Sequence, residues 1–112
     1  MAIARKITQF SKLEIDHLWK NVHPALKHDG FLLLKAPRQG SFGRILIVIA
    51  KKVGNAPARN KKRRQIKAIF YENKVYEKGF DWIIVVKKPI IALDFQELAA
   101  LLLPVMGTLS AS

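Results

Sequence analysis

The chain has 112 residues and no cysteine, and its 20 lysines and arginines against 8 acidic residues give a formal net charge of +12. The lack of cysteine excludes disulfide scaffolds, iron–sulfur clusters and thiolate zinc sites, and an apolar half of the composition excludes disorder caused by low hydrophobicity. The length favours one domain over residues 1–112. The apolar segments are too short for a membrane span, so we expect a cytoplasmic protein. The excess of positive charge indicates a polyanionic partner.

The first predicted element is an amphipathic helix over residues 12–22. Ser11 and Glu14 have the spacing of a capping box, in which each side chain binds the other residue's backbone N–H. Apolar residues then recur with helical spacing, at Ile15, Leu18, Trp19 and Val22. Pro24 ends the helix because proline cannot continue its hydrogen bonds. Two interpretations of Trp19 stay open: a core residue, or a stacking platform for bases.

Two strands are expected next, over residues 31–35 and 45–50. The segment 38–43 is rich in glycine and serine and is interpreted as a hairpin turn between them. The second strand is apolar at every position and rich in β-branched residues. Such a strand is expected to be covered on both faces or to lie at the centre of a sheet.

A basic helix is predicted over residues 58–73, after a turn in which Asn55 or Ala56 is the N-cap and Pro57 lies in the first helical turn. Eight of the 20 basic residues fall within residues 51–67, with no acidic residue among them. A helical wheel gathers one contiguous outward face from Asn60, Arg63, Arg64, Lys67 and Tyr71. A solvated face usually mixes both signs of charge, so this face favours phosphate binding instead.

The third predicted strand covers residues 82–86, with Trp82 expected in the core, and a last helix covers residues 95–103. Asp94 and Glu97 form a second capping-box pattern at the start of that helix. The predicted order is helix, two or three strands, helix, strand, helix. This order indicates an α+β fold, a two-layer sandwich in which helices pack on a small, mostly antiparallel sheet.

The sequence shows no constellation for independent catalysis. The three histidines lack the spacing of metal ligands, and the acidic residues are dispersed, so no paired carboxylates could hold catalytic metal ions. We therefore predict no catalytic and no metal-binding residue.

Residues 50–70 resemble the signature region of the bacterial ribonuclease P protein subunit. That family has a Lys-Lys-hydrophobic-Gly-Asn-Ala turn followed by an Arg-Asn-Arg-x-Lys-Arg-x-x-Arg helix. Here residues 51–56 form the turn, and the helix matches either in identity or in charge at Arg59, Asn60, Lys61, Arg63, Arg64 and Lys67. Residues 81–89 also resemble the family's later strand and its basic end. Lys62 and Gln65 depart from the pattern, because the family usually has apolar residues there, and Lys62 is expected at the buried edge of the helix.

The resemblance implies the small protein of a ribonucleoprotein endonuclease that removes the 5′ leader of precursor tRNA. In that family the RNA subunit carries the active site and its Mg²⁺ ions, so the protein alone would be inactive and bind no cofactor. The fold would include a left-handed crossover through the basic helix. Two competing hypotheses are a structural RNA-binding protein, such as a ribosomal one, and a DNA-binding module or self-sufficient nuclease.

The resemblance also implies two RNA-binding surfaces. The catalytic RNA would contact the turn and the basic helix, at Lys51, Lys52, Asn55, Arg59, Asn60, Lys61, Arg63, Arg64 and Lys67. The single-stranded leader would enter a cleft between the first helix and the sheet, lined by Trp19, Phe31, Lys87 and Lys88.

Overall fold

The computed structural model describes residues 5–107. The helices and strands follow one another as α2 (Lys12–Asn21), β1 (His23–His28), β2 (Phe31–Pro37), β3 (Ile45–Ile49), α3 (Ala56–Glu72), β4 (Phe80–Val86) and α4 (Phe95–Met106). Three short 3-10 helices connect them, η1 (Lys51–Val53), η2 (Val75–Glu77) and η3 (Lys88–Ala92).

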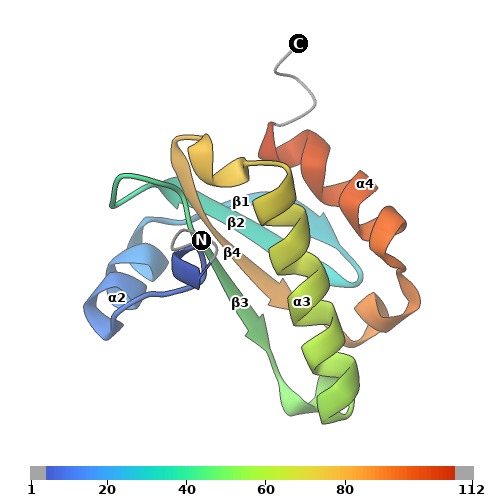
Figure 1. Cartoon of the computed structure of the whole chain (residues 1–112). Coiled ribbons are helices and arrows are strands. Elements are labelled where there is room, and N and C mark those ends of the chain that lie inside the picture. Colours follow the sequence, from blue (N-terminus) through green and yellow to red (C-terminus); the bar gives the residue numbers. More distant parts are fainter. Residues whose placement is uncertain (1–4, 108–112) are drawn as a thin grey trace.

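The four strands form one sheet in the order β1-β2-β4-β3 (Figure 1). The β1/β2 and β2/β4 pairs are antiparallel, and β3 and β4 are parallel. The sheet is therefore mostly antiparallel, as predicted. Helix α3 connects the two parallel strands. With α3 in front of the sheet and β3 running downward, β4 lies to the right of β3, which makes this crossover left-handed, against the usual rule.

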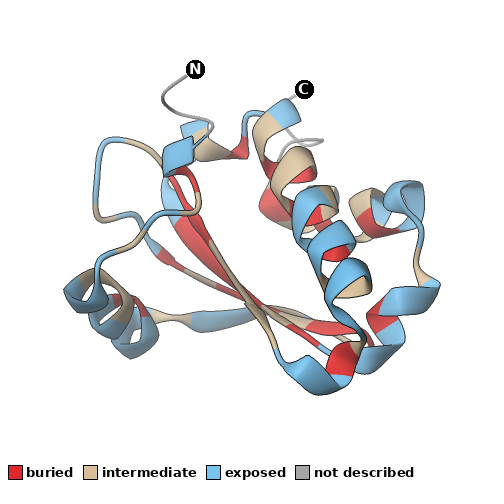
Figure 2. Ribbon diagram, turned by 60° about the horizontal axis from the view of Figure 1, so that its bottom comes forward, coloured by how far each residue is buried: buried red, intermediate tan, exposed pale blue. Residues whose placement is uncertain are grey.

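Alternating side chains divide between the two faces of the sheet. Helices α3 and α4 cover one face, and their shared core contains Phe31 and Trp82 from the sheet, Ile66 and Phe70 from α3, and Leu98 and Leu102 from α4. Helix α2 covers only part of the opposite face, where Leu18 packs against Leu34, Ala36 and Ile83. Figure 2 shows that most of α2 is exposed and that the buried residues concentrate in the sheet and on the inner side of the other helices.

Local signals in the sequence set the helix starts. Ser11 Oγ accepts the Glu14 N–H at 3.2 Å, while Glu14 Oε1 accepts the Ser11 N–H at 2.8 Å. Asp94 and Glu97 cap α4 in the same reciprocal way, at 2.8 and 3.0 Å. Both capping boxes are confirmed. At α3 the N-cap is Asn55, whose Oδ1 accepts the Ala58 N–H at 2.9 Å.

The expected hairpin over residues 38–43 is wrong, because β4 lies between β2 and β3. The segment crosses the start of β4 instead. A Cβ at Gly43 would lie 2.4 Å from the Phe80 carbonyl oxygen, so this close approach of two backbones requires glycine. Strand β3 is consequently an edge strand and not the centre of the sheet.

The sequence leaves strand β1 open, because it predicts either two or three strands before the basic helix. It contains Pro24, which cannot donate to a neighbouring strand and is therefore typical of edge strands. The register against β2 shifts between Pro24 and Leu26, as at a bulge. Helix α4 also continues beyond its predicted end, through Pro104 to Met106.

Candidate nucleic-acid interface

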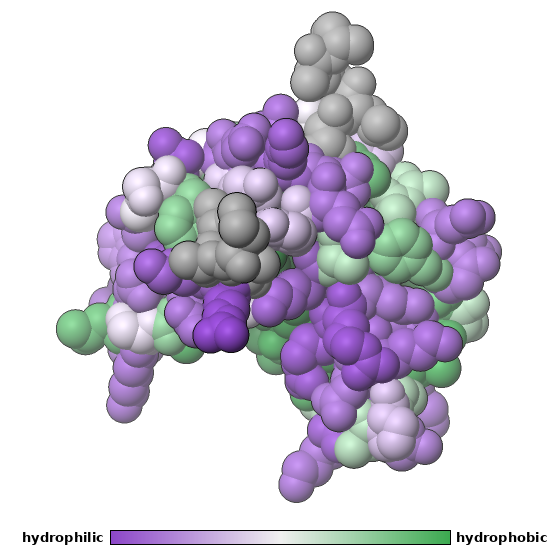
Figure 3. Space-filling model, in the orientation of Figure 1, coloured by the Kyte–Doolittle hydropathy of each residue, from purple (hydrophilic) through white to green (hydrophobic). Residues whose placement is uncertain are grey.

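The outer face of α3 carries cations that have no carboxylate partner among residues 5–107. Its exposed members are Asn60, Lys61, Arg63 and Arg64, and Lys67 is half-buried. Arg63 Nη1 donates to Asn60 Oδ1 at 2.9 Å, which orients that guanidinium. Within the described residues the only ion pair joins Arg44 to Glu14, on the other side of the sheet. Figure 3 shows hydrophilic side chains gathered over α3. We call this set of five residues the α3 basic face.

Lys62 does not belong to the α3 basic face. The residue is only 5% exposed, and its Nζ donates to the Leu93 carbonyl and, at 3.0 Å, to Gln65 Oε1. Burial lowers the pKa of Lys62 from its ordinary value of 10.5. Its position at the buried edge is confirmed, and its amine connects α3 to the segment that precedes α4.

The turn before α3 adds further predicted RNA-binding residues. Lys51 and Lys52 are exposed on η1. The side-chain oxygen of Asn55 is engaged as the cap of α3, which leaves its NH₂ group for other partners. Arg59 is half-buried, and its Nε has no hydrogen-bond partner among the described residues.

A groove lies at the carboxyl ends of β3 and β4. Its volume is about 650 Å³, and its lining consists of Val48, Ala50, Lys52, Val85, Val86, Lys87 and Lys88. The three valines come from the two strands, and Ala50 and the lysines come from the segments that follow them. The structure thus brings together two predicted cleft residues, Lys87 and Lys88, with Lys52 from the predicted RNA-binding turn. We call this feature the strand-end groove.

The other two predicted cleft residues lie elsewhere. Trp19 is 44% exposed on α2, which excludes a core position. Phe31 is 0% exposed and belongs to the core beneath α3 and α4, so the prediction that it lines a leader cleft is wrong. The reason is strand alternation: Phe31 and Leu33 point towards α3 and α4, whereas Leu34 points towards α2.

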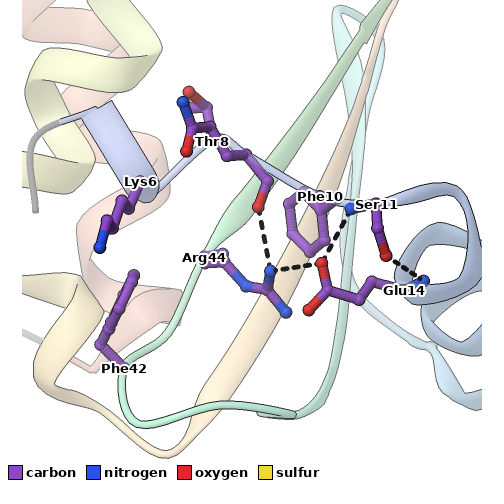
Figure 4. A pocket seen from close by; sticks show the side chains of 8 residues that line it. Lys6, Thr8, Phe10, Ser11, Glu14, Phe42 and Arg44 are labelled. Carbon is purple, nitrogen blue, oxygen red and sulfur yellow. Dashed lines mark hydrogen bonds and ion pairs between the residues drawn. The ribbon is translucent and has the colours of Figure 1, made fainter.

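Sequence reasoning missed a buried arginine that holds α2 on the sheet (Figure 4). Arg44 is 7% exposed, and its Nη1 lies 3.0 Å from Glu14 Oε1 and 2.9 Å from the Gln9 carbonyl oxygen. Its guanidinium stacks over the Phe10 ring at 4.3 Å. Glu14 is already explained as a cap, and no spacing rule connects it to a residue 30 positions later, so the sequence holds no signal for this pair.

Asp81 holds the backbone of the segment that precedes β3. Its carboxylate accepts the backbone N–H groups of Arg44 and Gln39, at 2.9 and 3.1 Å. Burial raises the pKa of Asp81 above its ordinary value of 3.8, although these two hydrogen bonds act in the opposite direction. Asp81 therefore fixes the backbone just before β3, from which the Arg44 side chain reaches α2.

The Arg44–Glu14 pair predicts an acid-dependent loss of stability. Its hydrogen bond from Arg44 is the largest cause that holds the pKa of Glu14 below the ordinary value of 4.5. The folded state thus favours the charged carboxylate, and the pair stabilises the protein above pH 4.5 and loses its effect as the pH falls through the lowered pKa. Wild type should be more stable than Glu14→Gln near neutral pH, and this difference should shrink in acid, as measured by urea unfolding.

Glutamine can still form the capping box, so this substitution removes mainly the charge. The raised pKa of Asp81 has the opposite effect on stability in acid, but Asp81 is present in both proteins and largely cancels from the difference. A stability difference that is the same at every pH would contradict the role assigned to the pair.

Neither a cluster of metal-ligand side chains nor a membrane-length helix occurs among the described residues. No group of three or more His, Asp and Glu residues there is arranged to hold a metal ion. Over the same residues, no helix has the length and apolar character that crossing a membrane requires. The fold and the α3 basic face define a small α+β protein that binds a polyanion.

Comparison with known proteins identifies the family. A family model described as Ribonuclease P matches residues 9–110. The ribonuclease P protein component of Citrifermentans bemidjiense is 35% identical over 79 residues, which cover 70% of this chain and 68% of that protein. The corresponding protein of Mycoplasma capricolum is 34% identical over 86 residues, with 74% and 78% covered.

Solved structures agree with this assignment. The RNase P protein from Thermotoga maritima aligns with a TM-score of 0.74 at 27% identity, over 88% of this chain and 94% of that chain. An RNase P protein mutant from Staphylococcus aureus has the same fold, with a TM-score of 0.80 at 19% identity over 97% and 92%. The chain belongs to the ribonuclease P protein family, the protein subunit of the tRNA-processing ribonuclease P enzyme, and the RNA of that enzyme is its partner.

Proposed function

We propose that the chain binds ribonuclease P RNA through the α3 basic face and presents the strand-end groove and Trp19 to the 5′ leader of precursor tRNA. In this proposal the RNA subunit, with Mg²⁺, performs the cleavage in the cytoplasm, and the protein alone is inactive. The observation that carries the proposal is the α3 basic face, in which clustered cations lack any carboxylate partner among the described residues.

The chemistry of this face suits the backbone of folded RNA. Guanidinium groups bind phosphate oxygens through two parallel hydrogen bonds, and lysine adds a mobile charge. Arg63 is already oriented by Asn60, which reduces the entropy that it loses on binding. RNA helices are bound through backbone and shape, so a rigid helix that presents an array of cations is an appropriate surface.

The position of Trp19 supports a role at the leader. Glu14 lies on the flank of α2 that contacts Arg44, and Trp19 follows five residues later, roughly 140° around the helix axis. Leu18, between them on the wheel, points into the sheet. Trp19 therefore lies on the flank of α2 away from Arg44, and the same face of the sheet carries Val48 and Val85 of the strand-end groove. An exposed indole offers a flat aromatic surface on which a single-stranded base can stack.

Four of the eight acidic residues are engaged in structural contacts, which supports the view that the protein has no catalytic centre of its own. Asp81 is buried with both oxygens hydrogen-bonded to backbone groups, and Glu14 is engaged by Arg44 and Ser11. Asp94 and Glu97 are occupied in the capping box of α4. Two-metal hydrolysis needs convergent carboxylates with free oxygens, and these four residues do not provide them.

Reconstitution tests the proposed function. The protein is added to a bacterial ribonuclease P RNA at a Mg²⁺ concentration too low for the RNA alone, and mature 5′ ends are measured from precursor tRNA. We expect cleavage only when both components are present. Lack of stimulation, or cleavage by the protein alone that disappears when one acidic residue is replaced, would contradict the proposal.

The leader surface predicts a selective defect in Trp19→Ala. Loss of one stacked base costs about 1–3 kcal/mol, so the holoenzyme should bind precursor tRNA with a long leader about 5- to 150-fold more weakly. Binding of mature tRNA and of ribonuclease P RNA should change little, since α3 lies on the opposite face of the sheet. Equilibrium binding with leaders of one nucleotide and of several nucleotides measures the effect.

Leu13→Ala is the matched control for this experiment. Leu13 lies on the same helix and is 80% exposed, but it points away from the sheet. This variant should bind precursor tRNA like the wild type. A weaker binding by Trp19→Ala that does not depend on leader length would count against a leader contact.

A further inference from the structure

A second cavity lies at the outer edge of the sheet, between β3 and α3. Its volume is about 360 Å³, and its lining consists of Thr8, Leu46, Ile47, Arg63, Arg64 and Lys67. Three of these residues belong to the α3 basic face, and the other three belong to β3 and to the segment beside it. We call this feature the β3-edge pocket; it is separate from the strand-end groove.

The backbone of β3 offers an unpaired peptide group to the β3-edge pocket. In a parallel ladder, alternate residues of a strand direct their N–H and C=O groups to opposite sides. The Arg44 carbonyl oxygen accepts the Trp82 N–H of β4 at 2.8 Å, whereas the Ile45 N–H points outward to the Ile7 carbonyl oxygen at 2.7 Å. Ile47 follows the same outward direction as Ile45. No described strand lies beyond β3, so the N–H and C=O of Ile47 face the pocket.

The surroundings of this peptide group combine three kinds of chemistry. Arg63, Arg64 and Lys67 supply positive charge at the rim, and Thr8 supplies a hydroxyl group. Ile47 supplies an apolar floor on the α3 side of the strand, whereas the Leu46 side chain points to the α2 side. Figure 3 shows apolar side chains along β3, bordered by the hydrophilic side chains of α3. The volume falls within the range of small-ligand pockets. This set matches a nucleotide, which has an anionic phosphate, an apolar base face and a base edge that both donates and accepts.

We propose that one unpaired nucleotide of the bound RNA inserts into the β3-edge pocket. Its phosphate lies on Arg63, Arg64 and Lys67, and its base packs on the apolar floor, with the base edge hydrogen-bonded to the peptide group of Ile47. The nucleotide must be unpaired because base pairing would occupy that edge. This inference rests on the proposed function, since it requires that the α3 basic face binds RNA. An extended peptide added to the strand edge would lack the negative charge for three cations unless it were acidic.

Hydrogen exchange at single backbone amides tests this proposal. In the free protein, the Ile47 amide should exchange rapidly, and in the complex with ribonuclease P RNA its exchange should slow by about tenfold or more. The Ile45 amide is the internal control, since its hydrogen bond to Ile7 should protect it in both states. RNA binding without protection of Ile47 would overturn the pocket but not the proposed function. A protein that fails to bind the RNA at all would overturn the proposed function itself.

A second experiment blocks the β3-edge pocket with a chemical label attached to a residue that lines it. The chain has no cysteine, so Thr8→Cys can be coupled to a bulky maleimide at that one position. Unlabelled Thr8→Cys is the reference protein, and the labelled protein should bind RNA about 5- to 150-fold more weakly than this reference, which is the effect expected when one base is displaced. The dependence on salt should not change, because the three cations remain. Labelled Lys12→Cys, on the exposed part of α2, should bind normally.

The other possible outcomes also discriminate. Unchanged affinity of the labelled protein, or weaker binding with a smaller salt dependence, would mean that no base occupies the pocket. If Thr8→Cys folds poorly, Thr8→Val is used instead, because valine keeps the shape of the threonine side chain. The hydrogen exchange of the Ile47 amide is then measured in this variant, with and without RNA. Protection of Ile47 by a peptide of alternating glutamate and valine, but not by RNA, would identify a peptide-binding edge and overturn the proposal.

Discussion

Replacing Phe31 by alanine is expected to lower the free energy of unfolding by about 3–5 kcal/mol, the usual cost of truncating a buried aromatic residue. The Phe31 side chain is completely buried, lies in the core beneath α3 and α4, and stacks on His28 with ring centroids 5.0 Å apart. The substitution should affect binding of the catalytic RNA and of the leader together, because both surfaces depend on the same sheet. Urea unfolding at neutral pH measures the change.

Trp19→Ala is the comparison for this experiment. Trp19 is 44% exposed and lies outside both core clusters, so its replacement should change the stability by less than about 1 kcal/mol. The sequence assigns both aromatic residues to the leader cleft. We expect replacement of Phe31 to affect folding and replacement of Trp19 to affect binding only. A Phe31→Ala protein as stable as the wild type, with a defect confined to leader binding, would contradict the buried position.

Replacing Arg64 by alanine is expected to weaken binding of ribonuclease P RNA by about 1–3 kcal/mol, the range for a charged hydrogen bond. This cost corresponds to about 5- to 150-fold in affinity. Arg64 is exposed on the α3 basic face without a carboxylate partner among residues 5–107. The slope of log affinity against log salt should also fall by about one unit for each phosphate that the protein no longer binds. Binding titrations at several salt concentrations measure both quantities.

Lys62→Met is the matched control, since it removes one positive charge from the same helix. The amine of Lys62 is buried and bound to the Leu93 carbonyl, so it should not contact RNA. We expect nearly unchanged RNA affinity and salt dependence, and a stability cost of about 1–3 kcal/mol if Leu93 is left unpaired. Equal reductions of affinity and salt dependence in both variants would mean that net charge, and not the position on the helix, determines binding.

The sequence predicted those elements whose signals are local. Ser11, Asn55 and Asp94 are side-chain caps within three residues of the groups that they bind. Ser11 and Asp94 begin their helices as expected, and at α3 the structure selects Asn55 from the two predicted alternatives, Asn55 and Ala56. The helical wheel also identified the outward face of α3, and Lys62 was expected at the buried edge, where the structure places it. The α3 basic face follows directly, because residues opposite a buried stripe must face solvent.

The remainder depends on interactions between residues distant in the sequence. The insertion of β4 between β2 and β3 is not encoded in either strand alone, and the hairpin prediction over residues 38–43 failed for that reason. The bond between Arg44 and Glu14 likewise forms only once α2 lies across the sheet. Phe31 is a different case: alternation along β2 restricts it to the same side as Leu33, but the sequence does not say which side faces α2.

The late position of β4 in the sequence has a consequence for the order of folding. The β1–β2 pair connects neighbouring segments and can form early, whereas β3 pairs with β4 across the whole of α3, as in the pairing of Ile45 with Trp82. Until residues 80–86 are present, β3 has no neighbour in the sheet and α3 has no completed surface to pack against. During synthesis, a chain that stops before Val86 contains every cation of α3 but lacks the completed sheet that holds this helix in place. We therefore expect the folded RNA-binding surface to form only after β4 has left the ribosome.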